Sequence, residues 1–179
     1  NWGRSCCSSR GLFKNEPENV LYLRGLRDRF REYPLVLEVG HGSWVEEDIL
    51  DLLVELGVRI CNIDQPLFGR SIKPHALVTA PVGYVRLHGR NYGNWFSKKA
   101  DVRERYDHLY TLAELDPWVD RTKQIAEAAQ DTYVVTNNHY LGKAVVNAAE
   151  IGSILLGQPI CAPPQLIEHY PQLGSQQPD

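Results

Sequence analysis

The stretch LVLEVGHGSWVEEDILDLLVELGVRICNID, residues 35–64, decides the fold class. It holds a short apolar run suited to a buried strand, Leu35–Val39, and a second expected strand, Val58–Ile63. Between them, Trp44–Leu56 is long enough for a helix and is bounded by capping residues. A strand, a helix and a second strand in this order predict a βαβ unit with parallel strands.

The ends of the expected helix are marked by specific residues. Ser43 can cap its first turn, and Glu46, three residues later, completes a capping box. Gly57 stands at the other end, where a left-handed backbone commonly terminates a helix.

The same alternation continues on both sides of this unit. We expect a helix over Asn19–Arg31, strands over Gly83–Leu87 and Thr132–Thr136, and helices over Thr111–Ala129 and His139–Leu156. The α/β pattern therefore contains about four βα units with parallel strands. Such strands form either an open doubly wound sheet or a closed barrel, and periodicity does not choose between them. A complete eight-unit barrel needs about 250 residues, so this chain supplies roughly half of the units.

Composition and charge exclude some classes of protein. With 43% hydrophobic and 23% charged residues, the chain is typical of one globular domain with a sizeable core. A formal net charge of -3 predicts no broad basic surface for nucleic acid, although a local basic cleft could still exist. No apolar run approaches the roughly 18 residues of a membrane span, so we expect a cytoplasmic protein without membrane contact. The four cysteines lack zinc-site spacing and are expected to be reduced.

Polar side chains recur on one face of the expected strands. Because side chains alternate along a strand, Arg86 and His88 share one face while Val85 and Leu87 share the other. If the apolar face meets the helices, Arg86 and His88 point inward, and His88 lies at the carboxyl end, where barrel enzymes carry their chemistry. The other polar positions of this kind are Glu38 in the first strand, Asn62 and Asp64 in the second, and Asn137 and Asn138 after the fourth.

This set of side chains suggests chemistry on an anion. Arg86 could bind the anion, helped by the amides of the set, while His88 or Glu38, with Asp64 beside them, moves a proton. The opposite interpretation is a structural network in which Glu38 or Asp64 pairs with Arg86. The sequence alone does not choose, because structural ion pairs resemble catalytic sites.

Two loops supply further candidates. Arg90, Tyr92 and Trp95 belong to the segment Arg90–Lys99, whose cations, amides and rings suit a loop that closes over a substrate or stacks on bases. An ordinary surface loop with packed aromatics is the alternative. His41, after the first strand, could join the same site or lie on the surface.

A divalent metal is a separate option for the strand residues. Glu38, Asp64 and His88 offer oxygen and imidazole ligands of the kind that Mn, Zn or Mg accepts. No short-spacing motif supports such a site, so we expect no metal and leave the cofactor open. Further along, Tyr110 and Trp118 belong to an aromatic segment that we attribute to packing rather than chemistry.

Three segments together resemble a known family. They are LEVGHGSW at residues 37–44, YVRLHGR at residues 84–90, and Asn137-Asn138 followed by Ala144 and Asn147-Ala148. In this order and spacing, over residues 18–156, they resemble the domain of unknown function 72 family, also called the YecE-like family.

The resemblance implies a fold but no reaction. It implies a TIM-type (β/α) barrel, of which this chain would supply the C-terminal half. The family's recurrent positions fall on Glu38, Ser43, Trp44, Asp64, Arg86, His88, Gly89, Asn138 and Asn147. The family is similar to barrels such as endonuclease IV and xylose isomerase, which is an analogy of fold alone. At Gly40 the family pattern usually has arginine, so this chain would bind an anion less well if that arginine contributes.

The resemblance also divides the chain. We expect an irregular N-terminal segment over residues 1–17, a partial (β/α) barrel domain over 18–173 and a polar tail over 174–179. The polar stretch Gly3–Arg10 stands where the family has an apolar strand, which a truncation or a reading-frame error would explain. The absence of methionine predicts that the chain is part of a longer translation product.

Three functions remain open at this point. The first is an enzyme that acts on a small anionic or phosphorylated substrate at the carboxyl ends of the strands, with Arg86 holding the anion. The second is a nucleic-acid-binding or endonuclease IV-like barrel, in which Arg86 and Arg90 contact phosphates and Tyr92 or Trp95 stacks on a base. The third is a non-catalytic scaffold or a truncated fragment. The oligomeric state is not predicted, although two copies could pair to close a barrel.

Overall fold

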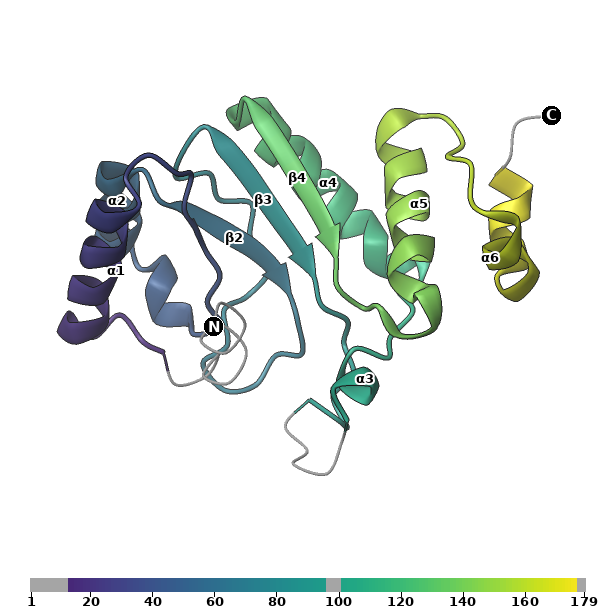
Figure 1. The fold of residues 1–179 in the computed structure, drawn as a ribbon, viewed down its shortest axis with the longest axis horizontal. Coiled ribbons are helices and arrows are strands. Elements are labelled where there is room, and N and C mark those ends of the chain that lie inside the picture. Colours follow the sequence, from purple (N-terminus) through teal and green to yellow (C-terminus); the bar gives the residue numbers. More distant parts are fainter. Residues whose placement is uncertain (1–12, 96–100, 177–179) are drawn as a thin grey trace. The chain divides into compact units, whose positions relative to one another are not determined.

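The computed structural model describes residues 13–95 and 101–176 (Figure 1). The expectations for residues 1–12, and for the part of the Arg90–Lys99 loop from residue 96 onward, lie outside the described residues.

The strands form one four-stranded sheet. They are β1 (Val36–Leu37), β2 (Arg59–Asp64), β3 (Val82–Leu87) and β4 (Asp131–Thr136), and their order in the sheet is β1-β2-β3-β4. β1 pairs with β2 in parallel, with Val36 opposite Arg59, and the arrows of β2, β3 and β4 point the same way in Figure 1. The predicted α/β class with a parallel sheet is therefore confirmed. In the part of the chain that the structure describes, the sheet is not closed into a barrel.

The chain divides into two compact units. The first runs through Ile63 and includes Leu67–Val85 and Ile125–Tyr133. The second contains Asp64–Pro66, Arg86–Gln124 and the chain from Val134 onward. The carboxyl-terminal residues of β2, β3 and β4 thus belong to the second unit, whereas the loop after β2 returns to the first unit at Leu67.

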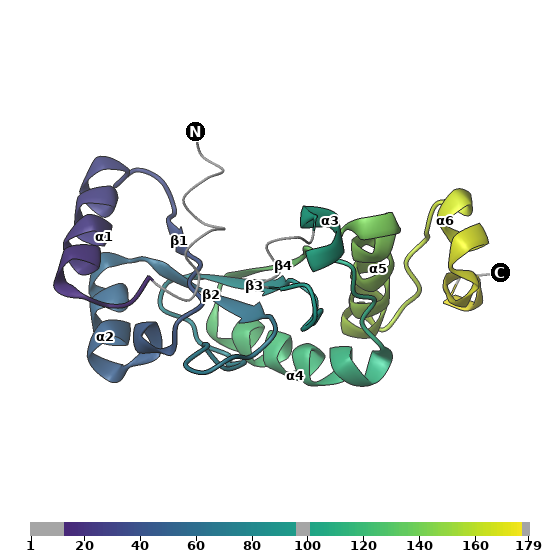
Figure 2. The same ribbon diagram turned by 90° about the horizontal axis from the view of Figure 1, so that it is seen from below.

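Two helices of the first unit lie side by side, as Figure 2 shows for α1 (Pro17–Arg29) and α2 (Glu47–Leu56). The Arg27 guanidinium Nε donates to the Leu56 carbonyl at 2.7 Å. This carbonyl lies at the end of α2, where the helix itself offers no hydrogen-bond donor. The backbone of Gly57 is left-handed there, with φ 61°, as the capping pattern predicts. The apolar core of this unit comprises Leu23, Val39, Trp44, Ile49, Leu52, Leu53, Val58 and Ile60.

The predicted helix start at Ser43 is wrong. Residues Gly42–Val45 form a 3₁₀ turn, and Glu46, whose ψ is 146°, separates this turn from α2. The Ser43 hydroxyl lies 2.9 Å from His41 Nδ1 and accepts the Asn15 N–H at 3.1 Å. The capping box does not form because both of its members make other contacts, the Glu46 carboxylate accepting from Asn15 Nδ2 at 3.2 Å.

The second unit contains helices of several lengths and two 3₁₀ turns among the described residues. They are α3 (Val102–Arg105), η2 (Tyr140–Gly142), α5 (Lys143–Leu156), α6 (Pro164–His169) and η3 (Pro171–Gln176), the last of which includes residues expected in the polar tail. The helix expected from His139 begins as α5 only at Lys143, because Leu141 and Gly142 have φ values of 53° and 80°, which interrupt a helix. The long helix α4 (Leu112–Ala128) has residues in both units. No helix among the described residues is long and apolar enough to span a membrane.

Candidate functional site

Backbone hydrogen bonds set the register in which the strand ends meet. The His88 N–H donates to the Asp64 carbonyl at 3.0 Å, and the Asn137 N–H donates to the Leu87 carbonyl at 2.7 Å. The residues that follow β3 are thereby held between those that end β2 and those that follow β4. Asp64, His88 and Asn138 are all buried there, so the predicted gathering of polar residues is observed for these three positions.

An ion pair with a hydroxyl beside it forms the first part of the cluster. Arg90 binds Asp64 in a bidentate manner, from Nε to Oδ2 at 2.8 Å and from Nη2 to Oδ1 at 2.9 Å. The Tyr110 hydroxyl donates to Asp64 Oδ2 at 2.5 Å and accepts the Gly89 N–H at 2.8 Å. The hydrogen bond with Asp64 raises the pKa of Arg90, against the lowering effect of burial. Burial, followed by the Asp64 charge, raises the pKa of Tyr110 well above its ordinary value.

Gly89 is required in this part of the cluster. Its φ is 92°, a region that residues with a side chain rarely adopt. A Cβ atom at this position would lie 2.9 Å from the Cβ of His108. The glycine therefore lets the chain turn after His88 and present its N–H to Tyr110.

Glu114 extends the ion pair to the start of α4. Its Oε2 accepts the Thr111 N–H at 2.9 Å, and Thr111 Oγ1 accepts the Glu114 N–H at 3.3 Å, which is the capping-box pattern. Its Oε1 lies 3.2 Å from His108 Nε2 and 3.7 Å from Arg90 Nη1. Burial raises the pKa of Glu114. The hydrogen bonds from Thr111 and the charges of His108 and Arg90 outweigh burial, so the pKa is lower than its ordinary value.

A second chain of contacts joins Arg86 to His88 through Asn137. Arg86 Nη2 donates to Asn137 Oδ1 at 3.0 Å, and Asn137 Nδ2 lies 3.0 Å from His88 Nδ1. His88 is fully buried, and its ring meets Trp95 and Tyr106, each with its centroid 6.2 Å away. A guanidinium, an amide and an imidazole are thus in direct contact beside an aromatic wall, which is a common composition for a small-ligand site.

The amides beyond β4 are part of a buried network. Asn147 Oδ1 accepts the Tyr110 N–H at 3.0 Å and Asn138 Nδ2 at 2.7 Å, and Asn147 Nδ2 donates to the Tyr110 carbonyl at 3.0 Å. The same nitrogen donates to Glu150 Oε2 at 2.7 Å. Burial raises the pKa of Glu150, against the effect of its hydrogen bonds. This network fixes the segment around Tyr110. Asn138 and Asn147 therefore help to position the residues of the site.

Three predicted site residues, Glu38, His41 and Asn62, belong to the first unit. The Asn62 side chain forms hydrogen bonds within the first unit. Its Nδ2 donates to the Leu77 and Tyr84 carbonyls at 2.9 and 3.1 Å. His41 contacts Ser43, as described above, and Glu38 is half-buried. Their joint action with Asp64 and His88 stays a prediction.

The two aromatic residues of the loop after β3 differ in exposure. Tyr92 is 52% exposed, whereas Trp95 is 8% exposed and packs edge-on against Tyr106 at 6.1 Å. Tyr110, Glu114 and His108 were not predicted as site residues. The position of Tyr110 among other aromatics indicated packing, and only its hydroxyl could have signalled a polar role.

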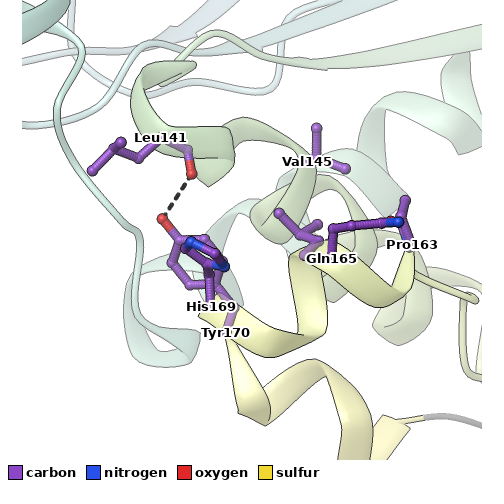
Figure 3. A pocket seen from close by; sticks show the side chains of 7 residues that line it. Leu141, Val145, Pro163, Gln165, His169 and Tyr170 are labelled. Carbon is purple, nitrogen blue, oxygen red and sulfur yellow. Dashed lines mark hydrogen bonds between the residues drawn. The ribbon is translucent and has the colours of Figure 1, made fainter.

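Within residues 13–95 and 101–176, no group of three or more His, Cys, Asp and Glu side chains is placed to hold a metal ion. A hollow of about 650 Å³ lies elsewhere, beside α5 and α6, and Figure 3 shows Tyr170 donating to the Leu141 carbonyl at its side. Its lining residues are Leu141, Val145, Pro163, Gln165, Leu166, His169 and Tyr170. None of them belongs to the strand-end cluster.

Comparison with known proteins identifies the family. A family model described as protein of unknown function DUF72 matches residues 11–166. The chain belongs to the DUF72 family. This confirms the resemblance drawn from the strand-end motifs, which contain Arg86, His88 and Asn138.

Solved structures of other DUF72 proteins have a similar fold. A DUF72 family protein from Thermotoga maritima MSB8 is 32% identical, with a TM-score of 0.75, and the match covers 81% of this chain and 54% of that one. One from Enterococcus faecalis V583 is 24% identical, with a TM-score of 0.74, covering 86% and 57% respectively, and this likeness bears on the fold alone. The chain thus spans little more than half the length of these DUF72 relatives. The comparison with curated proteins gives no match.

Proposed function

We propose that this DUF72 chain binds a small anionic or phosphorylated ligand at the carboxyl ends of β3 and β4, where Arg86 holds the anion and His88 exchanges a proton with the ligand. The observation that carries the proposal is the chain of contacts from Arg86 through Asn137 to the buried ring of His88. A guanidinium carries only hydrogen-bond donors and binds anions through charge-assisted hydrogen bonds.

The contacts of Arg90 make it a poor candidate for the anion-binding cation. Both Asp64 oxygens accept from Arg90, and Glu114 lies beside the same guanidinium. The charge of Arg90 is therefore balanced within the cluster, and Asp64 is best explained as the residue that holds Arg90. The nucleic-acid hypothesis assigned Arg90 to a backbone phosphate, so this pairing weakens its support.

Phosphate binding followed by calorimetry tests the proposal. Inorganic phosphate should bind the full chain saturably, and Arg86→Gln should weaken that binding by at least about tenfold, because one charge-assisted contact contributes about 1.5–3 kcal/mol. Arg103→Gln is the matched control, since the Arg103 side chain is 75% exposed and lies 3.9 Å from Asp101. Equal phosphate affinity in the wild type and Arg86→Gln would refute the proposal.

We also propose that the sheet is part of a TIM-type (β/α) barrel. Its strands follow each other in sequence order, β1-β2-β3-β4, whereas an open doubly wound sheet reverses its order at a switch point. Sequential parallel strands are the arrangement of a (β/α) barrel. A crystal structure of the product of the whole gene should show a further strand on the outer edge of β4, and a solvent-exposed edge there would contradict the barrel.

We also propose that the protein is located in the cytoplasm. Among the described residues, Cys61 and Cys161 are free thiols, and Cys161 is exposed. Exposed free thiols are commonest in reducing compartments. Fractionation of cells that produce the whole protein would test this, with recovery in the secreted or envelope fraction as the contrary result.

A further inference from the structure

Asn137 makes two side-chain contacts that together determine which way its amide points. Its Oδ1 faces Arg86 Nη2 at 3.0 Å, and its Nδ2 faces His88 Nδ1 at 3.0 Å. An arginine guanidinium has donors only, so the atom that meets it must be the amide oxygen. A flipped amide would set N–H against N–H and lose a charge-assisted hydrogen bond.

The direction of the second contact follows from the first. With the amide oxygen on Arg86, the Asn137 NH₂ group donates, and His88 Nδ1 must accept. A neutral imidazole carries one N–H, which therefore lies on Nε2. We propose that Asn137 is a positioning residue that holds His88 as the tautomer protonated at Nε2.

The surroundings of His88 keep its ring from exchanging the two nitrogens. The side chain is fully buried, with Trp95 on one side at an interplanar angle of 68° and Tyr106 on another at 41°. A ring flip would carry a carbon to the Asn137 amide and remove this acceptor from its partly buried N–H. The observed orientation keeps this donor paired and is therefore favoured.

His139 provides an internal contrast on the same asparagine. Its Nδ1 lies 3.1 Å from the backbone carbonyl oxygen of Asn137, and a carbonyl can only accept. His139 must therefore carry its proton on Nδ1 whenever this contact forms. Two histidines that touch one residue are thus assigned opposite tautomers.

The tautomer has a consequence for the ligand, and this step rests on the proposed function. His88 offers an N–H from Nε2, so in its neutral form it acts as a hydrogen-bond donor rather than as a base at that atom. Arg86 is also a donor. Two donors on one site match a ligand that presents acceptors, such as a phosphoryl or carboxylate group.

Nitrogen NMR of the histidine rings tests the assignment. The spectrum is recorded on the uniformly ¹⁵N-labelled full chain at about pH 8, where a histidine of ordinary pKa near 6.5 is neutral. His88→Gln and His139→Gln identify the two sets of signals. We expect the unprotonated nitrogen to be Nδ1 in His88 and Nε2 in His139. A His88 ring protonated at Nδ1 in the wild type overturns the inference.

Substitution of Asn137 tests its role as the cause. Asn137→Asp has a side chain of the same size that only accepts, so His88 should become protonated at Nδ1, while Asn94→Asp, which adds the same charge, should leave the His88 tautomer unchanged. An unchanged His88 tautomer in Asn137→Asp would overturn the positioning role. If that variant does not fold, the wild-type spectrum still decides the tautomer. Phosphate affinity is a separate readout, so a failed tautomer assignment and a failed anion site are distinguishable.

Discussion

The hydroxyl of Tyr110 lies between the Asp64 carboxylate, to which it donates at 2.5 Å, and the Gly89 N–H, from which it accepts at 2.8 Å. This one oxygen joins the end of β2 to the turn after β3. Because Asp64 also holds Arg90, the Tyr110 hydroxyl stabilises an ion pair as well as a turn.

Removal of the Tyr110 hydroxyl should lower the free energy of unfolding. Tyr110→Phe keeps the ring but leaves the buried Gly89 N–H without its acceptor and Asp64 without a donor, so we expect a loss of about 2–3 kcal/mol in the free energy of unfolding. For a chain of this length, that corresponds to a Tm lower by about 4–12 °C. Calorimetric melting measures it. Tyr133→Phe, on a side chain that is 56% exposed, should change stability by less than about 0.5 kcal/mol. A Tyr110→Phe protein as stable as the wild type would show that the hydroxyl contributes nothing.

Two glycines of the first unit should respond to alanine in opposite ways. A Cβ atom at Gly83 would lie 2.2 Å from the Ile125 Cγ2 atom, so Gly83→Ala should destabilise the chain by about 1–3 kcal/mol through overpacking. A Cβ atom at Gly25, within α1, would meet nothing within 4 Å, so Gly25→Ala should stabilise it by up to about 1 kcal/mol. Urea unfolding of both variants checks this, and a neutral Gly83→Ala would contradict the close contact of β3 with α4.

Glu114 should give the stability a specific pH dependence. A carboxyl whose pKa is lower in the folded chain contributes stability above its unfolded pKa of about 4.3 and loses it as the pH falls through the folded value. Glu114→Gln should therefore lose up to about 1 kcal/mol at about pH 7, a modest amount because the side chain is partly exposed. Near pH 3 the difference from the wild type should vanish.

Denaturant unfolding at both pH values measures this effect. Glu16→Gln is the control, since its side chain is 62% exposed and 3.8 Å from Lys14, and it should change stability little at either pH. A Glu114→Gln deficit of the same size at both pH values would assign the loss to the capping geometry rather than to the charge.

Much of the architecture could be predicted from the sequence, for a physical reason. Apolar runs such as Val58–Ile63 have few alternatives to a buried strand, and the carboxyl ends of parallel strands meet at one edge. Asp64, His88 and Asn138 could therefore be placed together before any coordinates were known. The left-handed backbone of Gly57 could also be predicted, because glycine commonly ends a helix in this conformation.

The partners of individual side chains could not be predicted in the same way. Arg90 and Tyr110 stand on loops, and which carboxylate they reach depends on the course of those loops, which no periodicity records. At Ser43 and Glu46 the spacing of a capping box was present, but contacts with Asn15 replaced it. Tertiary contacts of this kind override local signals and appear only in the folded chain.

Arg86 is proposed to serve a ligand rather than the stability of the fold, and one variant separates these two roles. Phosphate affinity and the free energy of unfolding are measured together for Arg86→Gln. We expect the affinity to fall by at least about tenfold in a variant that remains folded. A loss of about 3–5 kcal/mol in stability with unchanged phosphate affinity, as for a broken buried ion pair, would contradict the claim.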